Sequence, residues 1–359
     1  KYVDEYRDGE LAQILAQKIK SISKNPIRLM EICGTHTMAI FKHGIRSLLP
    51  QHIELLSGPG CPVCVTAIEE VDRTVKLARM PDVIVTTFGD MMRVPGTESS
   101  LQDEKGQGAD VRMVYSTFDA LKIAEENPKK EVAFLGIGFE TTAPTVAAAI
   151  RTAHEKDLPN FLVLSAHKVL PPAMDALLQG GDLGIDGFIC PGHVSTIIGT
   201  SAYESVVERF QIPCVVVGFE PIDILQGILM LVDQIENGRA EVEIQYTRVV
   251  SPEGNPGALK IMNEVFEPCD SPWRGLGSIP QSGLIIRHEF LTHDARERFN
   301  LEVPPAKEPP GCRCAEVLRG AIKPFECKLF RSGCSPRNPV GACMVSNEGT
   351  CAAYYKYHD

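Results

Sequence analysis

The chain has 359 residues, of which 44% are hydrophobic and 23% are charged, and its formal net charge is −10. This composition predicts a soluble globular protein of two or three domains, and the negative charge without a basic run argues against nucleic acid as a partner. No apolar stretch has membrane-spanning length and no signal peptide is recognisable, so we expect a cytoplasmic protein without a membrane partner. Because the first residue is Lys1 rather than Met, a removed leader stays an open alternative.

Short apolar runs alternate with amphipathic segments through the first two thirds of the chain. A first helix is expected at residues 9–23. Strands are expected at 28–32, 53–57, 83–88, 111–115, 132–137, 161–165, 186–190 and 214–219, and further helices at 66–80, 118–126, 142–155, 173–179, 197–209 and 221–236. Strands of this buried type that alternate with helices predict parallel sheets in an α/β fold.

The eight strands divide into two halves near residue 118. We therefore expect two parallel-sheet, Rossmann-like domains at 1–118 and 119–237 that face a cleft, followed by a smaller cysteine-rich domain at 238–359. Proline and glycine become frequent beyond residue 238, and the proline-rich stretch 303–311 predicts an extended connector into the cysteine-rich segment.

Reactive side chains repeatedly follow a predicted strand. The carboxyl ends of parallel strands lie at one edge of a sheet, where ligands bind, so residues distant in sequence should converge there. The residues concerned are Cys33, His36, Cys61, Cys64, Glu140, His167, Lys168, His193 and Asp223.

Cys33 and His36 allow two interpretations. The thiol could be an iron ligand or a nucleophile, with His36 as a proton donor or a supporting partner. Alternatively, Cys33 is an ordinary buried cysteine and Thr35 caps the following helix.

The other polar side chains also allow more than one interpretation. His193 either belongs to the site or caps the helix at 197–209, and Glu140 either lies in the cleft or is favoured by the helix dipole. His167 and Lys168 carry less weight, because they could be ordinary surface groups.

Cys61-x-x-Cys64 has the spacing of a redox pair. A position just before the helix at 66–80 would place the thiols near a helix N-terminus, which stabilises thiolate. The alternative is half of a zinc site, although no matching second pair follows at finger spacing. Three further cysteines lie in apolar or unremarkable contexts and are expected in the core: Cys190, Cys214 and Cys269.

Six of the 12 cysteines lie near the C-terminus, namely Cys312, Cys314, Cys327, Cys334, Cys343 and Cys351. The residues between them are polar and rich in turns, so a metal or disulfides are expected to organise the segment. Three disulfides would suit an exported protein, and zinc would suit paired C-x2-C knuckles. A 4Fe–4S cluster takes four thiolates without that spacing, and leaves two thiols that could accept its electrons.

The sequence closely resembles the HypD family of hydrogenase maturation proteins along nearly its whole length. The resemblance rests on EICGTHTMAIFKHGIRSLLP, LLSGPGCPVCVT, GFETTAPT, CPGHVSTIIG, GFEPIDIL and CKLFRSGCSPRNPVGACMVSNEGTCAAYYKY, in this order. It implies a scaffold on which the Fe(CN)2CO group of nickel–iron hydrogenase is assembled. It also implies the small chaperone HypC and HypE, which works with HypF, as partners, and an iron–sulfur domain after two α/β domains.

The family spacing implies roles for nine cysteines. The ligands of a 4Fe–4S cluster fall on Cys312, Cys327, Cys334 and Cys351, which leaves Cys314 and Cys343 as a redox pair. The iron-binding cysteine of the family falls on Cys33, and its CxxC pair falls on Cys61 and Cys64.

These assignments suggest an electron path that runs from the cluster through both cysteine pairs to iron at Cys33. His36, Glu140 and His193 would supply protons or hydrogen bonds to cyanide or to a carbon monoxide precursor. Two rival hypotheses are a stand-alone disulfide reductase driven by the cluster and a structural zinc protein. The sequence indicates neither the electron donor nor the source of the carbon monoxide.

Overall fold

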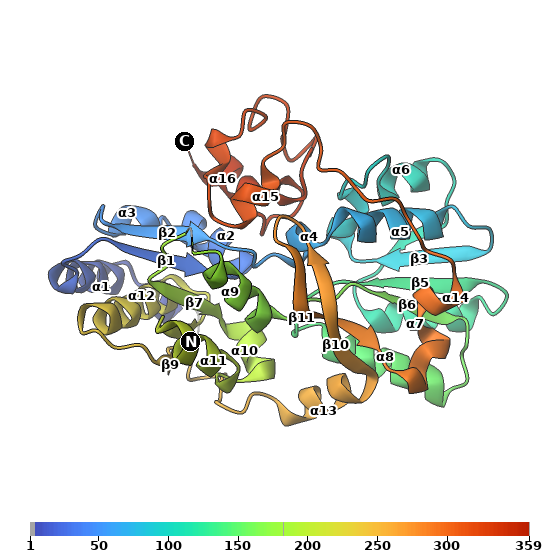
Figure 1. Cartoon of the computed structure of the whole chain (residues 1–359), viewed down its shortest axis with the longest axis horizontal. Coiled ribbons are helices and arrows are strands. Elements are labelled where there is room, and N and C mark those ends of the chain that lie inside the picture. Colours follow the sequence, from blue (N-terminus) through green and yellow to red (C-terminus); the bar gives the residue numbers. More distant parts are fainter. Residues whose placement is uncertain (1–3, 182, 359) are drawn as a thin grey trace.

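The structure is a computed structural model that describes residues 4–181 and 183–358. It contains two parallel sheets, one on each side of a β-hairpin, with the C-terminal segment lying above the first sheet and the hairpin (Figure 1). The five-stranded sheet has the order β2-β1-β7-β8-β9, with β1 at Ile27–Glu31, β2 at Ile53–Ser57, β7 at Gly187–Pro191, β8 at Cys214–Val217 and β9 at Val242–Ile244.

The four-stranded sheet has the order β4-β3-β5-β6, with β3 at Val83–Thr87, β4 at Val111–Met113, β5 at Glu131–Gly136 and β6 at Phe161–Ser165. All pairings in both sheets are parallel. The expected α/β fold with parallel sheets is therefore confirmed, and each of the eight expected strands lies within two residues of its predicted bounds.

The two sheets do not follow the expected division near residue 118. Strands β1 and β2 pair with β7 and β8, whereas β3 and β4 pair with β5 and β6, so each sheet takes strands from both sides of that position. The chain leaves the first sheet after β2, builds the whole second sheet, and then returns to add β7 directly beside β1. The grouping by sequence was wrong because strand patterns identify strands but not their neighbours.

Helices cover both faces of the sheets (Figure 1). In the first half of the chain they are α1 Gly9–Ile22, α2 Gly34–Lys42, α3 Ile45–Leu48, α4 Pro62–Val65, α5 Ile68–Ala78, α6 Leu101–Gly106, α7 Thr117–Glu126, α8 Ala143–Glu155 and α9 Leu170–Gln179. Successive strand residues face different cores: Ile189 packs with α1 and α12, whereas Phe188 packs with α9 and α11. This alternation explains why the strands are apolar on both faces.

The later helices are α10 Gly192–Ile198, α11 Glu204–Phe210, α12 Pro221–Glu236, α13 Pro256–Val265, α14 Ala295–Arg298, α15 Cys314–Leu318 and α16 Thr350–Tyr357. The single helix expected at 197–209 is instead interrupted between α10 and α11. Gly199 there has φ +76°, and a Cβ atom would lie 2.1 Å from the carbonyl oxygen of Pro252. A glycine in this conformation ends α10.

The region beyond residue 238 contains strands that the sequence analysis did not predict. Strand β9 adds to the edge of the five-stranded sheet, so the sheet reaches into the expected third domain. Strands β10 (Phe266–Trp273) and β11 (Gly277–Ile286) form an antiparallel hairpin between the two sheets (Figure 1). The expected connector is confirmed, since residues 301–309 form neither helix nor strand.

Of the apolar clusters in the described chain, the largest connects the two sheets, the hairpin and the C-terminal segment. It joins Leu56 of β2, Leu135 of β5 and Trp273 of the hairpin. Arg93 adds a polar link, because its guanidinium donates to the carbonyl oxygens of Pro336 and Val345 in the C-terminal segment, at 2.9 and 3.1 Å.

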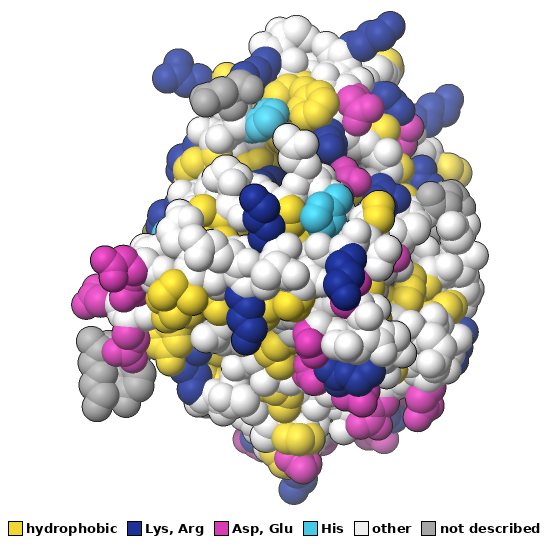
Figure 2. Space-filling view, turned by 90° about the vertical axis from the view of Figure 1, so that its left-hand side faces the viewer, with side chains coloured by type: hydrophobic (Ala, Val, Ile, Leu, Met, Phe, Trp, Pro, Cys, Tyr) yellow, Lys and Arg dark blue, Asp and Glu magenta, His cyan; other side chains and the backbone are white. Residues whose placement is uncertain are grey.

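The surface carries charges of both signs. On the face shown in Figure 2, Lys and Arg side chains are interspersed with Asp and Glu, so positive charge does not gather there into a stripe that would follow nucleic acid. Among the described residues, no helix is both long enough and apolar enough to cross a membrane.

Candidate functional site

The loops that follow β1 and β2 lie against each other at the carboxyl edge of the five-stranded sheet. The Gly34 N–H donates to the carbonyl oxygen of Gly60 at 3.0 Å. A Cβ atom on Gly60 would lie 2.1 Å from the backbone nitrogen of Cys33, so only glycine permits this approach. Adjacent strands thereby bring Cys33 next to the Cys61-x-x-Cys64 loop.

Cys33 is buried between the strand end and α2. Its Sγ lies 3.8 Å from Nδ1 of His193, in the first turn of α10. The two residues meet because β1 and β7 are neighbours in one sheet, not because two domains close on a cleft. Burial raises the pKa of the Cys33 thiol to about 12, which favours the neutral thiol.

His36 and His193 are neutral side chains. Burial lowers the pKa of each imidazole to about 4. Both rings lie against Phe219, with centroid separations of 4.8 and 5.2 Å. Together with Cys33 they form a compact group of potential ligands and proton acceptors.

Glu31 is a buried carboxyl group beside Cys33 that the sequence analysis missed. Its oxygens accept the Thr37 hydroxyl at 2.5 Å and the Cys33 N–H at 3.2 Å. Burial raises the pKa of Glu31 to about 8. An acidic residue within an apolar strand, just before a cysteine, was the available signal.

Cys61 and Cys64 are joined in a disulfide. They lie on α4, a four-residue helix with Cys61 at its N-cap, rather than directly before the longer helix α5 as expected. The Cys64 sulfur is 3.9 Å from the carbonyl oxygen of Ala342, the residue before Cys343. The disulfide therefore faces the C-terminal cysteine segment.

The six C-terminal cysteines line a single cavity, with Val317, Phe330 and Met344 among its apolar walls. The Sγ atoms of Cys314 and Cys343 are 2.6 Å apart. Thiol hydrogen bonds from Cys312 and Cys343 lower the pKa of Cys314. Gly341 closes the cavity, and a Cβ atom there would lie 2.7 Å from the Cys312 sulfur.

This donor set fits an iron–sulfur cluster. Cys312, Cys327, Cys334 and Cys351 supply four sulfurs from separate turns of one apolar cavity, and thiolates are the ligands that such clusters take. In residues 4–181 and 183–358, no three His, Cys, Asp or Glu side chains are gathered as they would be around a single metal ion. A cluster does not require that arrangement, because each thiolate binds a different iron atom.

Two further residues connect the parts of the site. Glu348 accepts the Thr35 hydroxyl at 2.6 Å and so joins the C-terminal segment to the Cys33 loop. Arg274, at the tip of the hairpin, is buried and donates to the carbonyl oxygen of Thr66 at 3.0 Å. Glu348 is far in sequence from Thr35, and Arg274 is far from Thr66, so the sequence carried no local signal for either contact.

Glu140 lies apart from this group. Its carboxylate accepts the Leu170 N–H at 2.9 Å at the start of α9, and its hydrogen bonds in the described chain do not reach Cys33, His36 or His193. Burial raises the pKa of Glu140 to about 7.

His167 and Lys168 are not surface groups, because they are 0% and 1% exposed. Lys168 donates to the Ser271 hydroxyl at 2.6 Å, inside the contact between β6 and the hairpin. Cys190 and Cys214 are buried as expected, whereas Cys269 is only partly buried because it lies on the two-stranded hairpin.

Comparison with known proteins gives one consistent result. The HypD family model, described as "Hydrogenase formation hypA family", matches residues 10–358. Hydrogenase maturation factor HypD of Azotobacter vinelandii is 50% identical over 366 residues, which cover 99% of this chain and 97% of the relative. The proteins of the same name from Rhizobium leguminosarum bv. viciae and Escherichia coli are 48% and 46% identical, again over 99% of this chain and over 95% and 98% of their own lengths.

Proposed function

Because this chain belongs to the HypD family of hydrogenase maturation factors, we propose that it is a redox-active scaffold on which the Fe(CN)2CO group is assembled for the hydrogenase large subunit. HypC would supply a second ligand to the iron, and HypE, working with HypF, would deliver cyanide. The observation that carries the proposal is the convergence of Cys33, His193 and the Cys61–Cys64 disulfide at one sheet edge.

Cys33 is the proposed attachment point for the iron, which is the cargo of the reaction. A cysteine binds metal as thiolate, and burial opposes the ionisation of Cys33. The proton must therefore leave as iron arrives. Nδ1 of His193, 3.8 Å from the sulfur, is the nearest identified acceptor.

The two cysteine pairs would carry thiol–disulfide exchange. One thiolate of Cys314 and Cys343 attacks the Cys61–Cys64 disulfide and forms a mixed disulfide while one thiolate leaves. The second thiol of the attacking pair then displaces the remaining sulfur. Two electrons have moved: Cys61 and Cys64 are reduced, and Cys314 and Cys343 are joined in a disulfide.

When held by Cys312, Cys327, Cys334 and Cys351, a 4Fe–4S cluster would supply single electrons beside the Cys314–Cys343 pair. The chain's own contribution is the apolar cavity, which keeps both thiols of that pair next to the four ligand positions. Gly341 permits this close packing, since a side chain there would displace the Cys312 sulfur.

The test is to replace Cys33 and to record infrared spectra of the anaerobically purified complex with HypC. Cys33→Ala should abolish the cyanide and carbon monoxide bands. Cys269→Ala is the matched control, since this partly buried cysteine lies on the hairpin away from Cys33, and its bands should persist. Unchanged bands in Cys33→Ala would refute the assignment of Cys33.

A second candidate function is a stand-alone disulfide reductase. It is favoured by the Cys61–Cys64 disulfide, whose Cys64 sulfur lies against the segment that carries Cys343. This function predicts reduction of a thioredoxin-like substrate without HypC. Turnover that persists in Cys33→Ala and disappears in Cys61→Ser would favour the reductase, whereas no turnover without HypC would eliminate it.

A further inference from the structure

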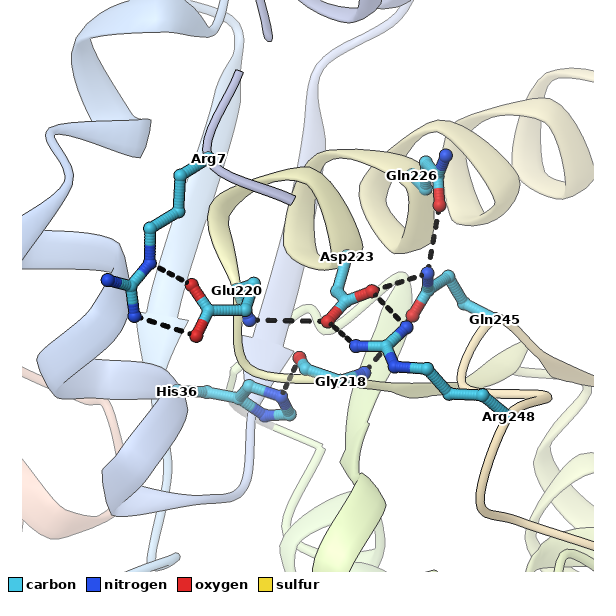
Figure 3. Close-up of polar contacts among 8 residues, drawn as sticks. All are labelled: Arg7, His36, Gly218, Glu220, Asp223, Gln226, Gln245 and Arg248. Carbon is cyan, nitrogen blue, oxygen red and sulfur yellow. Dashed lines mark hydrogen bonds and ion pairs between the residues drawn. The ribbon is translucent and has the colours of Figure 1, made fainter. Parts of the chain in front are cut away.

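A polar network with a buried centre lies just beyond the carboxyl end of β8 and reaches His36 (Figure 3). Its centre is Asp223 in the first turn of α12, whose side chain is 0% exposed. Arg248 donates to both carboxylate oxygens of Asp223, at 2.8 and 2.5 Å. The Gln245 amide donates to the same carboxylate at 2.9 Å. An ion pair with two parallel hydrogen bonds fixes the orientation of the carboxylate as well as its position.

The network holds the backbone of Gly218. The Gly218 N–H donates to the side-chain oxygen of Gln245 at 3.1 Å. A Cβ atom on Gly218 would lie 2.3 Å from an oxygen of Asp223, so the peptide is pressed against the ion pair. The Gly218 peptide is therefore fixed by groups that do not themselves touch Cys33.

The carbonyl oxygen of Gly218 faces His36 (Figure 3). It lies 2.9 Å from Nε2 of the imidazole. A carbonyl oxygen can only accept, so the proton of the neutral ring must be on Nε2, and Nδ1 keeps its lone pair. Nδ1 is buried, and within the described chain it has no hydrogen-bond partner.

We propose that Asp223, Gln245 and Arg248 are positioning residues that lock His36 in its Nε2–H tautomer and so keep Nδ1 as a bare acceptor in the buried group that His36 and His193 form around Phe219. Through Nδ1, His36 would then accept a hydrogen bond from an N–H or O–H group of a bound ligand or precursor, while its Nε2–H stays bonded to Gly218. This replaces the expectation of His36 as a proton donor. The identity of the bound group rests on the proposed function. The tautomer follows from the contact with Gly218 and does not depend on that function.

The tautomer can be measured directly in the full-length protein. Nitrogen-15 labelling of the 9 histidines, with long-range proton–nitrogen NMR spectra recorded before substrate iron or HypC is added, distinguishes protonated from bare ring nitrogens. The variant His36→Gln assigns the His36 signals by their loss. The expected result is a protonated Nε2 and a bare Nδ1, and a proton on Nδ1 in the unmodified protein would overturn the proposal.

Variants test the positioning role separately. Gln245→Ala removes the acceptor of the Gly218 N–H, so the two nitrogen signals of His36 should shift toward an average of both tautomers. Arg7→Ala is the control, because it removes an exposed ion pair with Glu220 on the same segment but no hydrogen bond of Gly218. Unchanged His36 signals in Gln245→Ala would overturn the role of the network.

A milder substitution provides the same test if the Gln245→Ala protein does not fold. Arg248→Lys keeps the positive charge beside Asp223 but not the two-pronged contact, so a smaller shift in the same direction is expected. No shift in a folded Arg248→Lys or Gln245→Ala protein counts against the proposal. These results do not depend on iron, so they leave the infrared test of Cys33 to decide the proposed function.

Discussion

At the scale of single residues, burial sets the protonation states of the groups around Cys33. The imidazoles of His36 and His193 have their pKa lowered to about 4, and the Cys33 thiol has its pKa raised to about 12. All three groups are therefore neutral at physiological pH until something binds. A site of neutral groups around a thiol suits the capture of a cation, because the negative charge forms only when the metal compensates it.

Glu140 provides a pH-dependent test at this scale. Burial raises its pKa to about 7 from 4.5, so the folded protein binds this proton more tightly than the unfolded chain does. Raising the pH from 4.5 to 7 should therefore destabilise the natural protein relative to Glu140→Gln, by at most about 1.4 kcal/mol per pH unit. Gln keeps the acceptor for the Leu170 N–H.

The measurement is urea unfolding of both proteins at several pH values in that window. Glu98→Gln serves as the control, because it makes the same chemical change at a carboxylate that is 79% exposed rather than buried. A constant difference for Glu140→Gln would show that Glu140 is ionised in the folded protein throughout.

At the scale of elements, neighbouring strand ends and glycines assemble the site. The loops after β2, β1, β7 and β8 stand side by side because these strands are consecutive in one sheet. Gly60 and Gly341 allow backbones and sulfurs to approach where a side chain would collide. The chemistry therefore depends on close packing between loops rather than on any single helix.

Gly60→Ala tests this dependence. The new methyl group would meet the backbone of Ile32 and Cys33 at 2.1 Å, and a backbone cannot rotate away as a side chain can. We expect a loss of about 3 kcal/mol in the free energy of unfolding, measured by urea titration. Gly106→Ala, in a helix position with nothing within 4 Å, should change stability by about 1 kcal/mol or less and in the stabilising direction. Equal effects of the two substitutions would contradict the packing argument.

At the scale of the whole molecule, the chain order determines which pieces can fold alone. The four-stranded sheet is an insertion between β2 and β7, and one apolar core continues from it into the hairpin and the five-stranded sheet. The Cys33 site and the C-terminal cysteines meet only in the complete chain, through contacts such as Thr35 with Glu348.

Fragments should reflect this topology. Residues 1–118 contain β1 without β7 and β3 without β5, so this fragment should stay unfolded and show no cooperative thermal transition by circular dichroism. The matched fragment 67–169 contains all four strands of the second sheet with α5 to α8 and should unfold cooperatively. Cooperative unfolding of 1–118 would mean that the sequence halves fold independently after all.

The amino-acid sequence by itself determined the first eight strands, the parallel α/β class and the reactive loops, whereas strands β9 to β11 were found only in the structure. Alternating buried strands and helices are local patterns, and the CGTH, CPVC and C-terminal cysteine motifs are conspicuous without a structure. The family resemblance was equally visible there. The same local patterns carry no information on which strands are neighbours, and this is why the division near residue 118 was wrong.

Only the tertiary structure decided which of these residues meet. It brought His193 to Cys33, placed the Cys61–Cys64 disulfide against the segment of Cys343, and set Glu140 apart. It also revealed Glu31 and the Asp223 network, because burial and partners depend on segments that are distant in the chain. Strand order and close packing are long-range properties, and they turn a set of separate motifs into one site.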